Sequence, residues 1–394
     1  LKNALPGTGR IAGDIAIALD RRNPALATAE GKLSGANVDL EWLAGRPLRI
    51  QRLDVAAHQL GLRIGEITLE LDGQPATLSG DIQRTPEGPV IDARLESPGI
   101  VVDKLLRPAA EKKPEKTSLW PLPVTGRIEV AAGFIEHQKR RVAPVQGTLR
   151  LEAQRARIEL REARMCGVSF PLELEAKPDG YTANVHLEMK KEPLEKAVVC
   201  LSGEKVQITG VTDLRAELVT RGKVDELLRN LTGTVRLDVS DGRLEKFELL
   251  GSILSMANFS NITELHKAAA AGIPYRTIMV GGHFEGGQFV VEEAGFDSNA
   301  LRLAASGRVG IAEPDTQLTV LVAPLARVDR LVGAIPILGN VLGGVLTTVP
   351  VAVSGDIRDP RVVPLGPHAV TDQLLGVFER TLKLPAKLVV PPQQ

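Results

Sequence analysis

The chain has 394 residues with 48 basic and 48 acidic side chains, so its formal net charge is zero. This balance argues against a nucleic-acid-binding protein, which would carry a basic excess. Hydrophobic residues make up 43% of the chain but aromatic residues only 3%, which leaves few rings for stacking on sugars or bases. The apolar residues are almost all Leu, Val, Ile and Ala, a composition that suits an ordinary aliphatic core as well as contact with acyl chains.

Short runs of alternating apolar and polar residues fill the first part of the chain, 1–106. They include Leu48–Val55, Leu62–Leu71 and Ala76–Ile82, separated by turns that contain glycine or proline. Strict alternation places apolar side chains on one face of a β-sheet. We therefore predict a β meander that ends at Val101–Leu106 in one helical turn or the last residues of a strand.

The segment 107–123 interrupts this pattern because it is charged, contains proline and lacks apolar periodicity. These properties predict a solvated loop or linker. The β pattern resumes at Val124, and we predict one further β-rich region over 124–394. Its strands include Thr234–Val239, Leu301–Ala305 and Gln317–Val322.

Helical patterns occur within this second region. They cover 224–230, 249–271, 331–346 and 370–384, the last of which is amphipathic. Leu331–Gly355 carries no charge, but it contains two prolines and several glycines. We therefore favour a short buried or interfacial helix followed by a strand over a membrane span.

A short phrase recurs along the chain: an apolar residue, then Ser or Thr, then Gly. It begins at Leu78, Val124, Ile208, Ala305 and Val353. Such recurrence is typical of a modular sheet that extends in one direction. At about one strand per 13 residues the chain would hold roughly 25–30 strands, and a single continuous sheet would run on the order of 100 Å.

Side chains that perform catalysis do not gather in the sequence. The six histidines are scattered, and neither an HExxH nor a GxSxG motif is present. Gly281–Gly287 is rich in glycine but lacks the GK[ST] ending of a phosphate loop, so we interpret it as a strand with hairpin turns. We expect no enzyme activity, no cofactor and no metal site.

The two cysteines, Cys166 and Cys200, lie in predicted strands without zinc-ligand spacing. Two interpretations stay open at this point. In an oxidising compartment the cysteines could pair across neighbouring strands. Otherwise they would be two buried free thiols.

The C-terminal half resembles the AsmA-like superfamily, in the YhdP-like branch of long envelope proteins. The matching motifs, in chain order, are Leu231–Gly242 followed by an apolar helix, Pro274–Phe289, Leu301–Val309, Ile335–Gly339 and Val351–Pro360. Met165–Gly167, Val199–Ser202 and Ile208–Gly210 also look like this branch. Residues 1–106 fit the repeated β pattern but carry no distinctive motif.

The resemblance implies a long, curled, antiparallel β-sheet of repeated β-groove units with a hydrophobic interior and a few short helices near the C-terminus. It implies a periplasmic protein, anchored in the inner membrane, that moves phospholipids towards the outer membrane. The expected partners are phospholipids, the membrane and envelope proteins at either end, with no nucleic acid. Because this chain starts at Leu1 without an anchor, we expect a fragment or a processed product. In the periplasm, Cys166 and Cys200 would form a disulfide.

The predicted lipid-contacting residues are apolar members of the alternating strands in the second region. They are Val235, Leu237, Val239, Leu244, Phe289, Val291, Leu301, Leu303, Leu318, Val320 and Val322. The alternative is that these residues pack on the helices at 249–271 and 331–346 as ordinary core. We also expect 331–346 and 370–384 to cap or gate one end of the groove, or to touch a membrane.

The leading hypothesis is thus a non-enzymatic phospholipid conduit. The second is a structural, assembly or chaperone scaffold of the cell envelope without lipid transfer. The third, an adhesin-like solenoid, is disfavoured by the predicted C-terminal helices. Conduit and scaffold share one sequence signature, so the sequence does not separate them.

Overall fold

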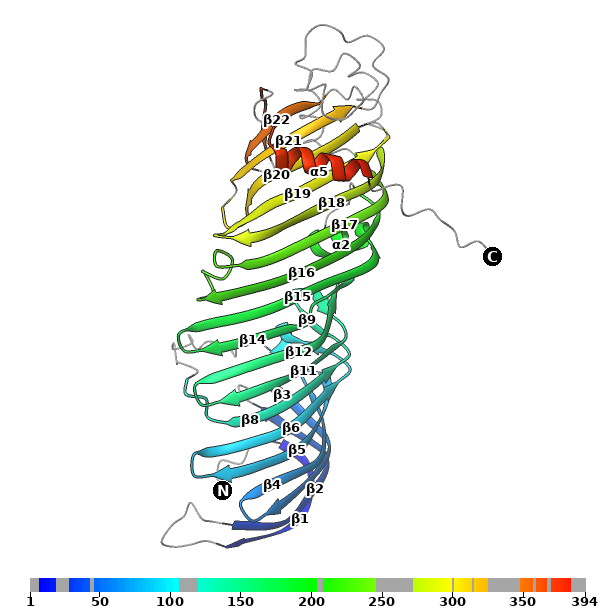
Figure 1. Ribbon diagram of the computed structural model, residues 1–394. Helices are drawn as coiled ribbons and strands as arrows, with labels where there is room; N and C mark the ends of the chain where they lie inside the picture. Colours follow the sequence, from blue (N-terminus) through cyan, green and yellow to red (C-terminus); the bar gives the residue numbers. More distant parts are fainter. Residues whose placement is uncertain are drawn as a thin grey trace, which may run out of the picture. The chain divides into compact units, whose positions relative to one another are not determined.

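The computed structural model describes residues 7–18, 28–42, 46–105, 120–203, 208–245, 272–299, 301–313, 315–324, 348–356, 359–366 and 370–383. The chain forms two compact units, the first of 1–165 with 169–184 and the second of 166–168 with 185–394. Each unit is built around curled, mainly antiparallel β-structure (Figure 1). The predicted mainly β class is confirmed.

The first unit contains ten strands that pair in chain order. They are β1 (Gly7–Ala18), β2 (Thr28–Trp42), β3 (Arg46–His58), β4 (Gly61–Leu71), β5 (Gln74–Thr85), β6 (Gly88–Ser97), β8 (Thr125–Ala132), β11 (Val145–Glu152), β12 (Arg155–Met165) and β14 (Leu172–Lys177). Every pairing in this series is antiparallel except β6 with β8, which is parallel.

The parallel pair reflects the chain between β6 and β8, which includes β7 (Ile100–Val101) and α1 (Val102–Leu105). Together with β9 (Ile135–His137) and β10 (Arg140–Val142), β7 forms a separate three-stranded sheet. The predicted linker at 107–123 therefore falls inside the first unit, although its residues 107–119 lie outside the described ranges. The two alternatives for Val101–Leu106 both occur, since a strand end is followed by one helical turn.

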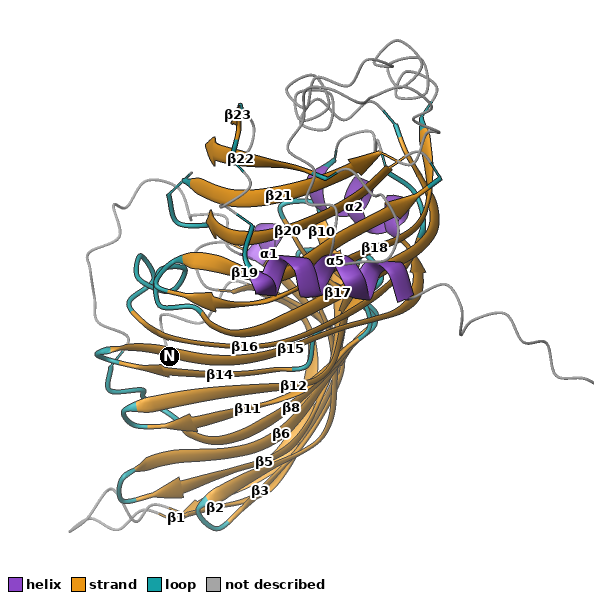
Figure 2. Cartoon of the chain, turned by 45° about the horizontal axis from the view of Figure 1, so that its top comes forward, coloured by secondary structure: helices purple, strands orange, loops and turns teal. Residues whose placement is uncertain are grey.

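The second unit contains eight strands that also pair in chain order, all antiparallel. They are β16 (Val211–Gly222), β17 (Thr232–Leu244), β18 (Ile273–Glu285), β19 (Gln288–Ser298), β20 (Leu301–Gly310), β21 (Thr316–Pro324), β22 (Val349–Gly355) and β23 (Arg361–Pro364). It also holds α2 (Leu194–Ser202) and α5 (Asp372–Lys383), and Figure 2 shows α5 lying along β19 and β20. Residues of both units occur in β15 (Gly180–Pro193) and β13 (Val168–Ser169).

The recurring Ser/Thr-Gly phrase has a backbone explanation. All five of its glycines have positive φ, including Gly80 at 138° and Gly126 at 125°. A Cβ on Gly126 would lie 1.9 Å from the carbonyl oxygen of Ile91, and one on Gly80 would lie 2.2 Å from that of Asp92. Only glycine adopts this backbone without strain and allows the neighbouring strand so close. The phrase thus marks points where a curled sheet bends.

The outcomes for the predicted helices and turns differ by segment. The tail helix is confirmed as α5, and the strand-and-turn interpretation of Gly281–Gly287 is confirmed by β18 and the turn after it. The helix expected at 224–230 is wrong, because these residues form turns. The helices predicted at 249–271 and 331–346 lie outside the described residues. Among the three helices that the structure describes, only α5 is near the C-terminus.

Candidate functional site: an uncovered apolar face

The strand register of the first unit aligns apolar residues into three rows that each cross all ten strands. The first row is Ile11, Gly35, Leu53, Ile67, Leu78, Leu95, Val130, Gly147, Leu160 and Leu172. The second is Gly13, Leu33, Val55, Ile64, Gly80, Ala93, Ile128, Leu149, Ile158 and Leu174. The third is Ile15, Gly31, Ala57, Leu62, Ile82, Ile91, Gly126, Leu151, Ala156 and Ala176. We call these thirty positions the apolar face.

The apolar face contains no polar or charged side chain at any of its positions. Ten strands spaced about 4.8 Å apart give it a length on the order of 40 Å, and three rows two residues apart give a width of about 13 Å. A bilayer hydrocarbon core is about 30 Å thick, so one leaflet, and hence one acyl chain, spans about 15 Å. The apolar face is therefore long enough for more than one acyl chain placed end to end.

Most of the apolar face is partly accessible to solvent. Only Ala57, Ile64, Ala93 and Gly147 are buried, and the other positions are half-buried or exposed. Ile11 is 54% exposed and Leu62 43%. Contiguous apolar surface that is accessible to solvent marks a binding surface more often than a structural one.

The opposite face of the same strands is polar and ion-paired. Arg63 Nε lies 3.1 Å from Asp81 Oδ1, and Arg157 Nη2 lies 2.8 Å from Glu175 Oε2. Hydrogen bonds from Arg157 and then Lys177 lower the pKa of Glu175 to about 2. This face stays charged and hydrated at neutral pH, so the two faces of the sheet differ sharply in polarity.

One margin of the apolar face is covered by the chain itself. The residues next to the first row include Ala132, Val145 and Ala163, all of which are at most 5% exposed. Beyond this margin Phe134 lies so close to Gly99 that a Cβ there would be 2.1 Å from the ring. The guanidinium of Arg141 stacks over the same ring, 4.1 Å from its centroid. The opposite margin, next to the third row, is exposed at Ile17, Leu60 and Arg84.

The eleven residues predicted to line a groove all lie in the second unit. The register places ten of them on one face of its sheet, and Leu244, five residues after Val239 in β17, joins the same hydrophobic cluster. Eight of them join a single hydrophobic cluster: Val239, Leu244, Leu301, Val320 and Val322 are buried in it, and Leu237, Leu303 and Leu318 pack against it. Val291 is buried outside the cluster, Val235 is half-buried, and Phe289 contacts Phe284. An ordinary packed core describes the eight better than an open groove does.

The sequence reasoning missed the apolar face of the first unit. Its signal was the alternation in 1–106, but alternation within one strand does not reveal which residues stand beside each other on the next. Only the register shows that every row stays apolar across ten strands. The first part of the chain also has no distinctive motif, so the predicted lipid-contacting residues all lie in the second region.

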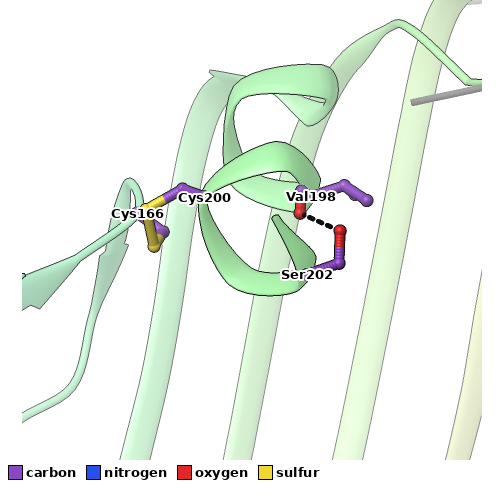
Figure 3. The surroundings of a disulfide bond; sticks show 4 residues. All are labelled: Cys166, Val198, Cys200 and Ser202. Carbon is purple, nitrogen blue, oxygen red and sulfur yellow. Dashed lines mark hydrogen bonds between the residues drawn. A yellow bond between two sulfur atoms is a disulfide. The ribbon is translucent and has the colours of Figure 1, made fainter. Parts of the chain in front are cut away.

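The structure joins Cys166 and Cys200 in a disulfide with a Cα–Cα distance of 5.5 Å (Figure 3). The expected placement of both cysteines in strands is wrong. Cys166 lies in a turn with φ of 56°, and Cys200 lies in α2. The N–H of Leu194 donates to the carbonyl oxygen of Gly210 at 2.8 Å, and its side chain packs against the hydrophobic cluster. The disulfide therefore ties α2, whose first residue Leu194 packs against the cluster, to the turn at Cys166.

The tail helix α5 covers the other face of that sheet. Leu374, Val377 and Phe378 are at most 1% exposed and pack against Ala304 and Leu321. Ala304 and Leu321 alternate with the core residues Leu303 and Val320, so α5 lies on the face opposite to the predicted groove residues. The roles predicted for 370–384, to cap or gate one end of the groove or to touch a membrane, stay predictions.

Metal-binding side chains do not gather in the described part of the chain. It contains no group of three or more His, Cys, Asp and Glu side chains that could hold a metal ion. Nor does any helix found there combine the length and apolarity needed to cross a membrane.

The most buried carboxylate is structural. Asp297 is 3% exposed; burial raises its pKa, but hydrogen bonds from Arg276 and Arg302 outweigh burial and leave the pKa lowered. Asp297 therefore stays ionised between two guanidinium groups.

Comparisons with known proteins add no assignment. No family model, curated protein or solved structure matches this chain.

Proposed function

We propose that this protein is a non-enzymatic phospholipid carrier in which acyl chains lie on the apolar face of the first unit. The observation that carries the proposal is the absence of any polar side chain over three rows and ten strands. Each CH₂ removed from water contributes about 0.8 kcal/mol, so a bound tail is strongly favoured over an exposed one. Because the surface is uniformly aliphatic, no position along it holds a tail much more tightly than the next.

The cellular setting that we propose follows the sequence resemblance. A member of the AsmA-like superfamily would act in the periplasm, between the inner and outer membranes. The Cys166–Cys200 disulfide supports an oxidising compartment, since such bonds are rare in the cytosol. The membrane and envelope proteins at either end are the partners that this role requires.

The test is native mass spectrometry with lipid extraction on the purified chain and two variants. Leu149→Glu places a carboxylate in the middle row, and we expect lipid occupancy to fall at least tenfold because a buried charge beside a tail is costly. Arg150→Glu changes the charge of the neighbouring residue on the polar face and should leave occupancy unchanged. The wild-type protein should carry phospholipids of several acyl lengths.

The alternative function is an envelope scaffold or assembly factor without lipid transfer. The packed core of the second unit favours it for that part of the chain, because a covered sheet face offers a lipid no access. A wild-type protein that purifies without lipid and takes up no fluorescent phospholipid would establish the scaffold in place of the carrier.

A further inference from the structure

The open margin of the apolar face contains a cavity of about 400 Å³. Its lining includes Leu62 and Ile82, which belong to the third row, together with Leu60, Pro89, Gln59 and Arg84. The cavity is thus continuous with the apolar face on one side and bordered by two polar side chains on the other.

Arg84 owes its position to the register of β5. Arg84 lies two residues after Ile82 and four after Gly80, and it pairs with Pro89. It therefore lies on the same face as the apolar rows. Its backbone N–H donates to the carbonyl oxygen of Leu60 at 2.9 Å, which fixes the strand beside the β3–β4 turn. The N–H of Ala29 donates to the carbonyl oxygen of Gln59 at the same distance, and Gln59 is one of the residues that line the cavity.

The charge of Arg84 is available to a ligand. Its side chain is exposed, and it forms no ion pair with any residue in the described ranges. Several arginines on the polar face, among them Arg63 and Arg157, are by contrast paired with carboxylates. Arg84 is therefore a cation at the edge of an aliphatic surface without a carboxylate partner in the described part of the protein.

We propose that Arg84 and Gln59 form a headgroup site for a lipid that carries an anionic phosphate, with its acyl chains entering the apolar face over Leu62 and Ile82. This inference rests on the proposed function. The apolar rows offer a phosphate no partner, so the headgroup of a bound lipid must lie at a margin. The margin along Ala132 and Val145 is buried, which leaves the open one. A guanidinium binds phosphate through two parallel N–H donors, and an amide N–H adds a third.

The experiment measures binding of three probes to the purified full chain: fluorescent phosphatidylglycerol, fluorescent diacylglycerol and soluble glycerol phosphate. We expect Arg84→Gln to weaken binding of phosphatidylglycerol about tenfold, because it removes a charge-assisted hydrogen bond. Binding of diacylglycerol, which has tails but no phosphate, should not change. The matched control Arg63→Gln removes a cation from the polar face and should leave both affinities unchanged.

The remaining outcomes separate the two proposals. If wild-type protein binds neither lipid, the carrier function fails. If it binds both lipids and Arg84→Gln loses nothing with phosphatidylglycerol, the headgroup site is overturned while the carrier stands. Glycerol phosphate that displaces phosphatidylglycerol at equal concentration would show that the site recognises a free anion and not a lipid. Retention of full affinity in Arg84→Lys would show that a point charge suffices without the paired donors.

Discussion

The two units share the same alternation of apolar and polar residues but differ in how far their apolar faces are buried. In the first, three apolar rows cross ten strands and remain partly accessible to solvent. In the second, the equivalent face is closed into a hydrophobic cluster against which Leu194 of α2 packs, and α5 covers the reverse face. Leu301, Val322 and Val351 are 0% exposed there, whereas none of the leucines on the apolar face is fully buried.

An alternating strand thus specifies an apolar face but not the segment of the chain that packs on it. The same types of residue, Leu and Val, form a packed core in the second unit and stay partly accessible to solvent in the first. The Cys166–Cys200 disulfide links α2, which contributes Leu194 to the edge of the hydrophobic cluster, to the turn at Cys166.

Truncating one leucine in each unit tests whether the two apolar faces differ in packing. Leu301→Ala in the second unit should lower the free energy of unfolding by about 2–5 kcal/mol, because it leaves a cavity in a packed core. Leu149→Ala in the first unit should cost less than about 1.5 kcal/mol, since its side chain is already partly in contact with water. Urea unfolding followed by circular dichroism measures both, and equal costs would mean that the first unit also has a packed core.

Removing the disulfide should have the next largest effect. Cys200→Ser opens a cross-link between residues 34 apart in sequence, which by chain entropy contributes up to about 4 kcal/mol. Hydrogen exchange should show lost protection in α2 and the strands beneath it but not in β3–β6. A protected α2 in the variant would show that packing alone holds this helix.

Gly126→Ala tests the bend that the recurring phrase encodes. The substitution adds a methyl group 1.9 Å from the carbonyl oxygen of Ile91 at a φ of 125°. It should destabilise the first unit by about 1–3 kcal/mol. Gly73→Ala is the control: Gly73 lies in a turn with φ of 75° and has room for a Cβ, its nearest neighbour being Glu70 Oε1 at 3.8 Å. The cost of Gly73→Ala should be limited to backbone strain. If both variants lose the same free energy of unfolding, the close approach of Gly126 to Ile91 is not the cause.

The smallest expected effect is the pH dependence of the second unit. The pKa of Asp297 is lowered in the folded state, so its contribution to stability is present above the unfolded pKa of about 4 and is lost as the pH falls through the folded value. Arg276→Gln should reduce the loss of unfolding free energy at acid pH. It should not change how the free energy of unfolding depends on pH near neutrality. Acid titration of unfolding with and without the substitution measures this loss, and an unchanged loss would show that Arg302 alone keeps the carboxylate ionised.

The sequence by itself determined the strands, their apolar faces and the bends. Alternation, turn residues and a repeated Ser/Thr-Gly phrase are local properties, because side-chain direction has a period of two along a strand and only glycine adopts the bent backbone. The amphipathic tail helix was predictable for the same reason.

What covers each face was decided only by the tertiary structure. Register between strands far apart in sequence aligned the thirty apolar positions and placed Arg84 at their margin. Eight of the predicted groove residues of the second unit belong to one hydrophobic cluster, whereas α5 packs on the opposite face. Burial depends on contacts between distant segments, and no local pattern records which segment comes to lie against which face.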